Sequence, residues 1–481
     1  MLMSSDESES ELHCAKSATI NSNNACGNVM ANATNPTLQA LLEKAGEVRL
    51  DQLDVLRADD SPIADVLNLI IEAAIHAGTS DVHIEPRDGF VQVRYRIDGL
   101  LRSIRRLPSS LFAALTARIK VLADLQVEEL KLAQTGRFRL PLDDKQYTVH
   151  VSTLPIADGE KVVLHIIDES NQALTLDALG LWGQNLRALN AAITQPHGLV
   201  LVSGPSGSGI STTLYAILTS LNSPRVNIAT IEDPVDYHLP GVNQTQVNPR
   251  SGMSMVNGLK AILQQDPNVI MVSELCGREA TELAVQAAGS GRLVCAGLHA
   301  DTAQAALRHC VGVGTEPFLV ASTLRAAVGQ RLVRRLCTRC RQEYKPSKDE
   351  AVHLLGLFGV KTKQQLATLH ELEQAAIKEG IGKELKQQAT TAGSVGRLFK
   401  ASEKGCNHCA HTGYRGSVGI YEVLAMSDTL QRLIVSHAAP AVIQQQAMEE
   451  GMLAMQVDGL VKALRGLTSI EEVVRVTSTI K

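Results

Sequence analysis

Residues 199–213, LVLVSGPSGSGISTT, have the composition of a phosphate-binding loop between a strand and a helix. An apolar run leads into the glycines, and the apolar stretch at 212–221 continues without a helix breaker. Glycines allow successive backbone N–H groups to turn inward around a phosphate, and the positive end of the next helix faces the same point. The residues predicted to contact nucleotide here are Gly204, Pro205, Ser206, Gly207, Ser208, Gly209, Ile210, Ser211 and Thr212.

Ile210 stands where such a loop normally carries a lysine. The missing ammonium group would contribute about 1.5–3 kcal/mol to phosphate binding. Electrostatic clamps on a transferring phosphoryl group typically supply a factor of about 10²–10³ in rate, which a branched hydrocarbon does not replace. Ser211 keeps a hydroxyl for Mg²⁺. The loop therefore predicts ATP with Mg²⁺ as a weakly held ligand and weak or absent hydrolysis.

Three further apolar, strand-like runs end in polar residues. Glu232 and Asp233 follow one run, Glu274 follows a second, and His299 closes a third. Carboxylates at such strand ends bind the water shell of a metal or orient an attacking water, so Glu232 and Glu274 are candidate catalytic residues and Asp233 a candidate ligand of the cofactor. Which glutamate is the base and which holds Mg²⁺ stays open. His299 is a candidate γ-phosphate contact, although a lone histidine is more often an ordinary hydrogen-bonded residue.

Four of the nine cysteines form two C-x-x-C pairs, with residues 341–405 between them. The pairs are Cys337 with Cys340 and Cys406 with Cys409. Four thiolates make a closed tetrahedral site with no open coordination position, which is typical of structural Zn²⁺. We therefore predict a zinc knuckle rather than disulfides.

Three arginines are candidates for contacting an anion. Arg94 and Arg96 are two residues apart and therefore point to one face of a strand, and Arg137 follows in a Thr-Gly-Arg segment. Such a face is either solvated or suited to an anion held by a neighbouring domain.

The composition excludes several classes of protein. The chain has 481 residues, a net charge of −4 and 3% aromatic residues, which argues against direct nucleic-acid binding by base stacking. No apolar run reaches the roughly 18 residues of a membrane span, and the acidic, serine-rich start is unlike a secretory signal. A cytoplasmic protein is the resulting prediction.

Periodicity divides the chain into segments. An amphipathic helix begins after Ser61-Pro62, and strand-like runs with one intervening helix follow as far as Asp168. The predicted organisation is a disordered tail at 1–36, a short helical region at 37–60, an α/β domain at 61–170, a linker at 171–180, a P-loop domain at 181–336, a zinc-binding subdomain at 337–425 with a helical insertion at 345–400, and a helical region at 426–481.

These residues resemble the type II secretion and type IV pilus assembly ATPase family, in its secretion and pilus-extension branch. The likeness runs from Ser61 to Thr479 and includes both cysteine pairs. Its other motifs are AGTSDVHIEP at 77–86, RYRIDG at 94–99, VSTLP at 151–155, GEKVVL at 159–164, IEDPV at 231–235, QDPNVIMV at 265–272 and GYRGSVGIYE at 413–422.

The resemblance implies an α/β fold in which a PAS-like domain precedes a RecA-like P-loop domain. It implies a cytoplasmic hexamer at the inner-membrane face, beneath platform proteins of the machine, with Arg94, Arg96 and Arg137 closing over the nucleotide between the domains. The hexamer would contain this chain alone or also a paralogue that keeps the lysine. The first 60 residues are short for the family's amino-terminal docking domain.

Departures from the family pattern gather around the nucleotide. Besides Ile210 they are Thr135 for aspartate, His150 for arginine, Ser273 for glycine, Leu275-Cys276-Gly277 for Ile-Arg-Asp, and Arg292 for histidine. Because several charge partners are absent together, the sequence favours a motor-family subunit with impaired ATP hydrolysis. The alternative is a competent but slow ATPase in which other basic residues compensate.

Overall fold

The computed structural model describes residues 62–168, 175–385, 387–391, 394–409 and 411–478. The predicted tail at 1–36, the short helical region at 37–60 and residues 171–174 of the predicted linker therefore lie outside the described residues. No helix in the described ranges is both long and apolar enough to cross a membrane.

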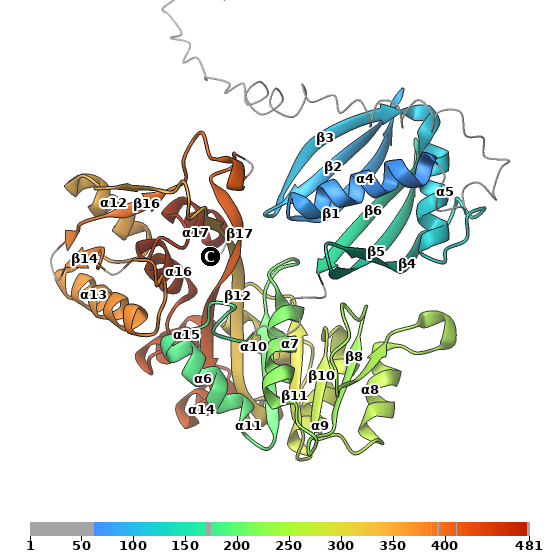
Figure 1. The fold of residues 1–481 in the computed structure, drawn as a ribbon. Helices are drawn as coiled ribbons and strands as arrows, with labels where there is room; N and C mark the ends of the chain where they lie inside the picture. Colours follow the sequence, from blue (N-terminus) through green and yellow to red (C-terminus); the bar gives the residue numbers. More distant parts are fainter. Residues whose placement is uncertain (1–61, 169–174, 386, 392–393, 410, 479–481) are drawn as a thin grey trace, which may run out of the picture.

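The first sheet is antiparallel and has six strands in the order β3-β2-β1-β6-β5-β4 (Figure 1). Two helices pack on it because their apolar stripes, which include Ile63, Leu67 and Leu115, share one core with Val82 and Ile84. The elements are α4 (Pro62–His76), β1 (Thr79–Arg87), β2 (Phe90–Ile97), β3 (Leu100–Pro108), α5 (Phe112–Leu122), β4 (Gln134–Leu142), β5 (Lys145–Ile156) and β6 (Gly159–Asp168).

The second sheet has seven strands in the order β17-β12-β7-β11-β10-β8-β9 (Figure 1). All neighbouring strands are parallel except β17, which runs antiparallel to β12. The strands are β7 (Gly198–Ser203), β8 (Ile228–Glu232), β9 (Asn243–Gln246), β10 (Val269–Val272), β11 (Leu293–Leu298), β12 (Leu324–Leu336) and β17 (Tyr414–Ala425).

Helices cover both faces of the second sheet, so its central strands are buried on both sides. Leu199 and Leu201 face one core, whereas Val200 and Val202 of the same strand face the other. The covering helices are α6 (Gly183–Ile193) and α7 (Ile210–Leu221) on one side, and α8 (Met255–Leu263), α9 (Gly277–Gly289), α10 (Ala303–Gly312) and α11 (Pro317–Thr323) on the other. The carboxyl ends of β7, β8, β10 and β11 therefore meet at one edge.

The segment between the cysteine pairs forms a lobe beside this sheet and shares a buried core with the ends of β12 and β17 (Figure 1). It contains β13 (Gln342–Tyr344), α12 (Lys348–Leu357) and α13 (Lys363–Lys378), followed by β14 (Thr390–Thr391), β15 (Ser394–Val395) and β16 (Leu398–Lys400). The expected helical insertion at 345–400 is thus helical only in its first part, because Gly380 and Gly382 adopt positive φ angles after α13.

The C-terminal residues form four helices that pack against the end of the second sheet and the lobe. They are α14 (Asp428–Val435), α15 (Pro440–Glu449), α16 (Met455–Leu464) and α17 (Ile470–Thr477). Just after α16, buried Arg465 pairs with Glu373 of α13 and ties the lobe to the sheet domain. Strand β17 lies within the predicted zinc-binding subdomain at 337–425, but it pairs with β12 and belongs to the second sheet.

Candidate functional site

The phosphate loop lies between β7 and α7, as the sequence predicts. Gly204 leaves no room for a side chain, because a Cβ atom there would lie 2.2 Å from Ser208 Oγ and 2.7 Å from the carbonyl oxygen of Gln330. Gly207 and Gly209 have φ angles of +74° and +89°, a region that favours glycine. Since no side chain caps α7, its first-turn N–H groups are available to an anion.

Gln330 of β12 holds this loop from behind and is only 1% exposed. Its Nε2 donates to the carbonyl oxygen of Ser208 at 2.9 Å, and its Oε1 accepts from Thr213 Oγ1 at 2.8 Å. The sequence motifs did not indicate this residue, and the available signal was an amide side chain inside a long strand with many apolar residues. Among the described residues, the buried Ser208 Oγ has no hydrogen-bond partner.

Ile210 is the first residue of α7 and points toward the carboxyl ends of β10 and β11. A Cβ atom on Gly297 would lie 2.9 Å from Ile210 Cγ2 and 2.1 Å from the carbonyl oxygen of Ser273. The isoleucine side chain also packs against the core beneath α7. It therefore fills the space next to the acidic strand ends with hydrocarbon.

Glu274 and His299 meet beside the loop. His299 Nε2 lies 3.4 Å from Glu274 Oε2, and its Nδ1 lies 3.3 Å from the carbonyl oxygen of Gly204. The backbone N–H of Asp233 donates to Ser273 Oγ at 3.2 Å, so the serine found in place of glycine links two strand ends. The structure thus brings Asp233, Glu274 and His299 to the edge that carries the phosphate loop.

Glu232 differs from these residues because its side chain is enclosed. It accepts hydrogen bonds from Tyr215 Oη, from Thr230 Oγ1 at 2.6 Å and from Gln244 Nε2 at 3.0 Å. Burial raises the pKa of Glu232, and these hydrogen bonds oppose that shift. The predicted catalytic role of Glu232 therefore falls on a carboxyl group that already accepts hydrogen bonds from three donors.

Arg94 and Arg96 are both engaged within the first sheet. Arg94 Nη2 lies 2.6 Å from Glu85 Oε1, and Arg96 Nε lies 3.0 Å from Asp81 Oδ2. Although burial raises the pKa of Glu85, hydrogen bonds from Arg94 and Lys161 lower it to about 2. The carboxylates of β1 thus neutralise two of the three arginines predicted to face the nucleotide.

Arg137 reaches from the first sheet to the second domain, where its Nη1 lies 3.4 Å from the carbonyl oxygen of Val235. In the described ranges, no ion pair joins Arg137 to a carboxylate. The strand pairing aligns Arg137 with His150, His150 with His165, and His165 with Asp81. His150, which stands where the family has an arginine, therefore lies between Arg137 and His165. His165 Nδ1 in turn lies 2.7 Å from Asp81 Oδ1.

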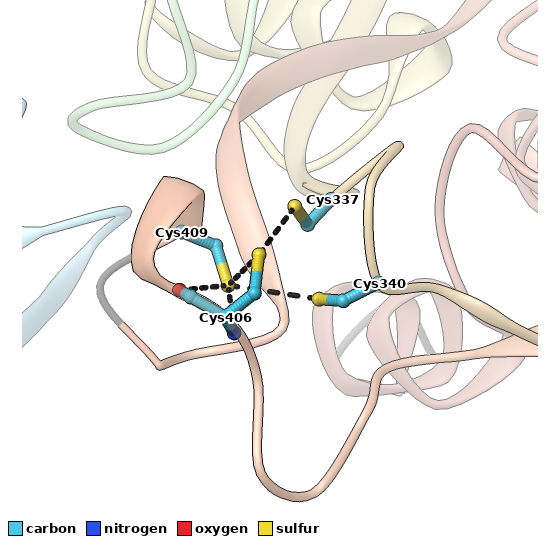
Figure 2. Close-up of side chains that lie close together, drawn as sticks. All are labelled: Cys337, Cys340, Cys406 and Cys409. Atoms are coloured by element: carbon cyan, nitrogen blue, oxygen red, sulfur yellow. Dashed lines mark hydrogen bonds between the residues drawn. The ribbon is translucent and has the colours of Figure 1, made fainter.

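The four predicted zinc ligands form one cluster, with all sulfur atoms within 4.8 Å of one another (Figure 2). The separation is 3.7 Å for Cys337–Cys406 and for Cys340–Cys409, and 3.8 Å for Cys406–Cys409. A tetrahedral centre with Zn–S bonds of about 2.3 Å places its sulfur atoms about 3.8 Å apart, so the cluster fits Zn²⁺.

Backbone donors prepare one of these sulfur atoms for the thiolate form. The N–H groups of Cys406 and Gly413 donate to Cys409 Sγ at 3.3 Å and 3.2 Å. Burial raises the pKa of the Cys409 thiol, but these donors and the neighbouring sulfurs outweigh it and lower the pKa to about 6. The donor set is therefore suited to a metal that binds thiolates.

A glycine-rich loop before α7, at the carboxyl edge of a mainly parallel sheet, defines an α/β protein of the P-loop class. The chain belongs to the type II/IV secretion system protein family, whose family model matches residues 57–475. The predicted resemblance to secretion and pilus assembly ATPases is thereby confirmed.

Two relatives illustrate the match. The chain is 40% identical over 423 residues to the type II secretion system ATPase E of Vibrio cholerae. The aligned region covers 87% of this chain and 76% of the relative. It is 37% identical over 421 residues to the type IV pilus assembly ATPase PilB of Pseudomonas aeruginosa. Here the aligned region covers 87% of this chain and 68% of the relative.

Solved structures agree with the predicted α/β fold with a RecA-like domain. The ATPase DotB of Legionella pneumophila has a TM-score of 0.58 at 17% identity, covering 86% of this chain and 95% of DotB. The pilus retraction motor PilT, solved with bound ADP, has a TM-score of 0.55 at 20% identity, covering 85% of this chain and 96% of PilT.

Proposed function

We propose that this chain is a nucleotide-binding, motor-family subunit of a type II secretion or type IV pilus assembly machine, with impaired ATP hydrolysis. The names of the relatives support the kind of machine. By the same analogy we propose a cytoplasmic location at the inner-membrane face, contact with the membrane platform, and a hexamer of this chain alone or with a lysine-intact paralogue.

The observation that carries the impaired hydrolysis is the environment of Ile210. Its Cγ2 lies against Gly297 of β11, which also faces the carbonyl oxygen of Ser273, so hydrocarbon occupies the space beside the acidic strand ends. Arg94 and Arg96 are held by Glu85 and Asp81 and do not replace the missing charge. Loss of one electrostatic clamp lowers phosphoryl-transfer rates by about 10²–10³.

The remaining residues of the loop fit a magnesium nucleotide. The N–H groups from Gly207 to Thr212 would hold phosphate oxygens, and the Ser211 hydroxyl would bind Mg²⁺. Glu274 and Asp233 would hold the water shell of the metal or the attacking water. Bound Mg²⁺ supplies charge neutralisation at the phosphates.

The test compares ATP hydrolysis by the wild-type chain, Ile210→Lys and Ile210→Met. Methionine matches the length of lysine without its charge, so it separates charge from shape. We expect little turnover by the wild type and Ile210→Met, and a rise of about 10²-fold or more in Ile210→Lys. Robust turnover by the wild-type chain would refute the proposal.

The alternative, a slow but competent ATPase, is favoured by one observation. Arg137 crosses to the carbonyl of Val235, close behind Asp233, and forms no ion pair in the described part of the chain. If it compensates for the lysine, wild-type turnover is measurable and Arg137→Ala abolishes it. Arg139→Ala, two residues along the same strand, is the matched control.

We also propose that the cysteine cluster holds a structural Zn²⁺ ion. It joins the end of β12, next to Cys337, to the segment that enters β17. Four sulfur ligands leave no position for substrate, so the ion would stabilise the fold rather than take part in catalysis.

A further inference from the structure

We infer that this nucleotide site selects a nucleoside diphosphate over the corresponding triphosphate. The inference rests on the proposed function in one respect, namely that the loop binds nucleotide at all. It goes further because it assigns a preferred ligand and hence a resting state of the subunit.

The half of the site that would hold the β-phosphate is intact. Gly207 and Gly209 keep their positive φ angles, and α7 begins with an uncapped first turn. Gln330 fixes the loop through Ser208 and Thr213. These contacts depend on backbone groups and not on the side chain of residue 210, so the loop keeps its donors for one phosphate group.

The half that would receive a γ-phosphate carries hydrocarbon and negative charge. Ile210 Cγ2 lies against Gly297, and Glu274 and Asp233 leave the neighbouring strand ends. The basic group closest to Glu274 within the described residues is His299, at 3.4 Å.

The two halves therefore affect the two nucleotides differently. A diphosphate presents its terminal phosphate to the backbone donors. A triphosphate carries one more negative charge and places it next to carboxylates, without the ammonium group that would neutralise it. Because a charge-assisted contact changes binding by about 10- to 150-fold, the diphosphate should bind at least about 10-fold more tightly.

Isothermal titration of the nucleotide-free full chain, in the presence of Mg²⁺, tests this with ADP and the non-hydrolysable triphosphate AMP-PNP. We expect ADP to bind about 10-fold or more tightly than AMP-PNP. In Ile210→Lys the AMP-PNP affinity should rise by about 10-fold or more and remove the preference, whereas Ile210→Met should keep it.

Equal or tighter binding of AMP-PNP by the wild-type chain would overturn the inference, as would a lack of ADP binding. Hydrolysis measured on the same preparation reports on the proposed function separately. Robust turnover by the wild type refutes impaired hydrolysis at any affinity ratio, and little or no turnover with an AMP-PNP preference refutes only the inference.

Discussion

Replacing one of the proposed zinc ligands should destabilise the attachment of the lobe between the cysteine pairs to the sheet domain. Cys409→Ser removes the sulfur that accepts N–H bonds from Cys406 and Gly413 and lies 3.7 Å from Cys340 Sγ. Because serine is a poor ligand for this thiophilic ion, we expect the variant to contain much less than one zinc ion per chain.

The size of the effect follows from the loop that the metal closes. Cys337 and Cys406 are 69 positions apart, and closing a loop of that length restricts the unfolded chain by about 4.4 kcal/mol at 25 °C. The Arg465–Glu373 pair anchors the same lobe at a second point, so this value is an upper limit. A loss of about 2–4 kcal/mol should lower the unfolding temperature of this domain by about 5–15 °C.

Metal analysis and thermal unfolding of the same preparations measure both effects. Cys276→Ser is the matched control, because Cys276 is exposed and lies outside the cluster. Near one zinc ion per wild-type chain is expected without added metal. A wild-type chain purified without chelators that lacks zinc, or a Cys409→Ser variant that keeps both its zinc and its unfolding temperature, would refute the assignment.

Two further predictions concern the loop and the first sheet. Gln330→Leu leaves Ser208 O and Thr213 Oγ1 without their partner at a cost of about 1–3 kcal/mol, so ADP affinity measured by calorimetry should fall about 10-fold. An unchanged affinity would contradict the role of Gln330. The hydrogen bond to Asp81 raises the pKa of His165, so its contribution to stability is complete below about pH 6.5 and is lost as the pH rises through the raised pKa. Between pH 6 and 9, the free energy of unfolding in urea should therefore fall more steeply in the wild type than in His165→Gln. Equal slopes would contradict a stabilising contact between His165 and Asp81.

The parts of the fold that could be predicted are those in which burial leaves a clear pattern. Strands β7, β10 and β11 are buried along their whole length and therefore appear as continuous apolar runs. Strands β3 and β4 were not predicted, because they form the two edges of the first sheet and expose many of their side chains. β17 was placed in the wrong unit because its partner, β12, lies before the lobe in the sequence.

The site shows the same limit at the level of single residues. Residue types and spacing predicted a common location for the loop, Asp233, Glu274 and His299, because the carboxyl ends of parallel strands share one edge of the sheet. The partners of Glu232 were not predictable, since Tyr215 lies on a helix before it and Gln244 on a later edge strand. The spacing of Arg94 and Arg96 gave their common face but not the carboxylates of β1 that bind them.

These observations explain how a phosphate loop persists without its lysine. The shape of the loop depends on Gly204, where a Cβ atom would collide with Ser208, on the positive φ angle of Gly209, and on the amide of Gln330. None of these contacts involves a charge at position 210. Under the proposed function, isoleucine in place of lysine removes electrostatic stabilisation of the transferring phosphoryl group while the cradle and the packing of α7 remain. Such a subunit would keep its fold and, by the further inference, a bound diphosphate, and would occupy a place in an assembly without turnover of its own.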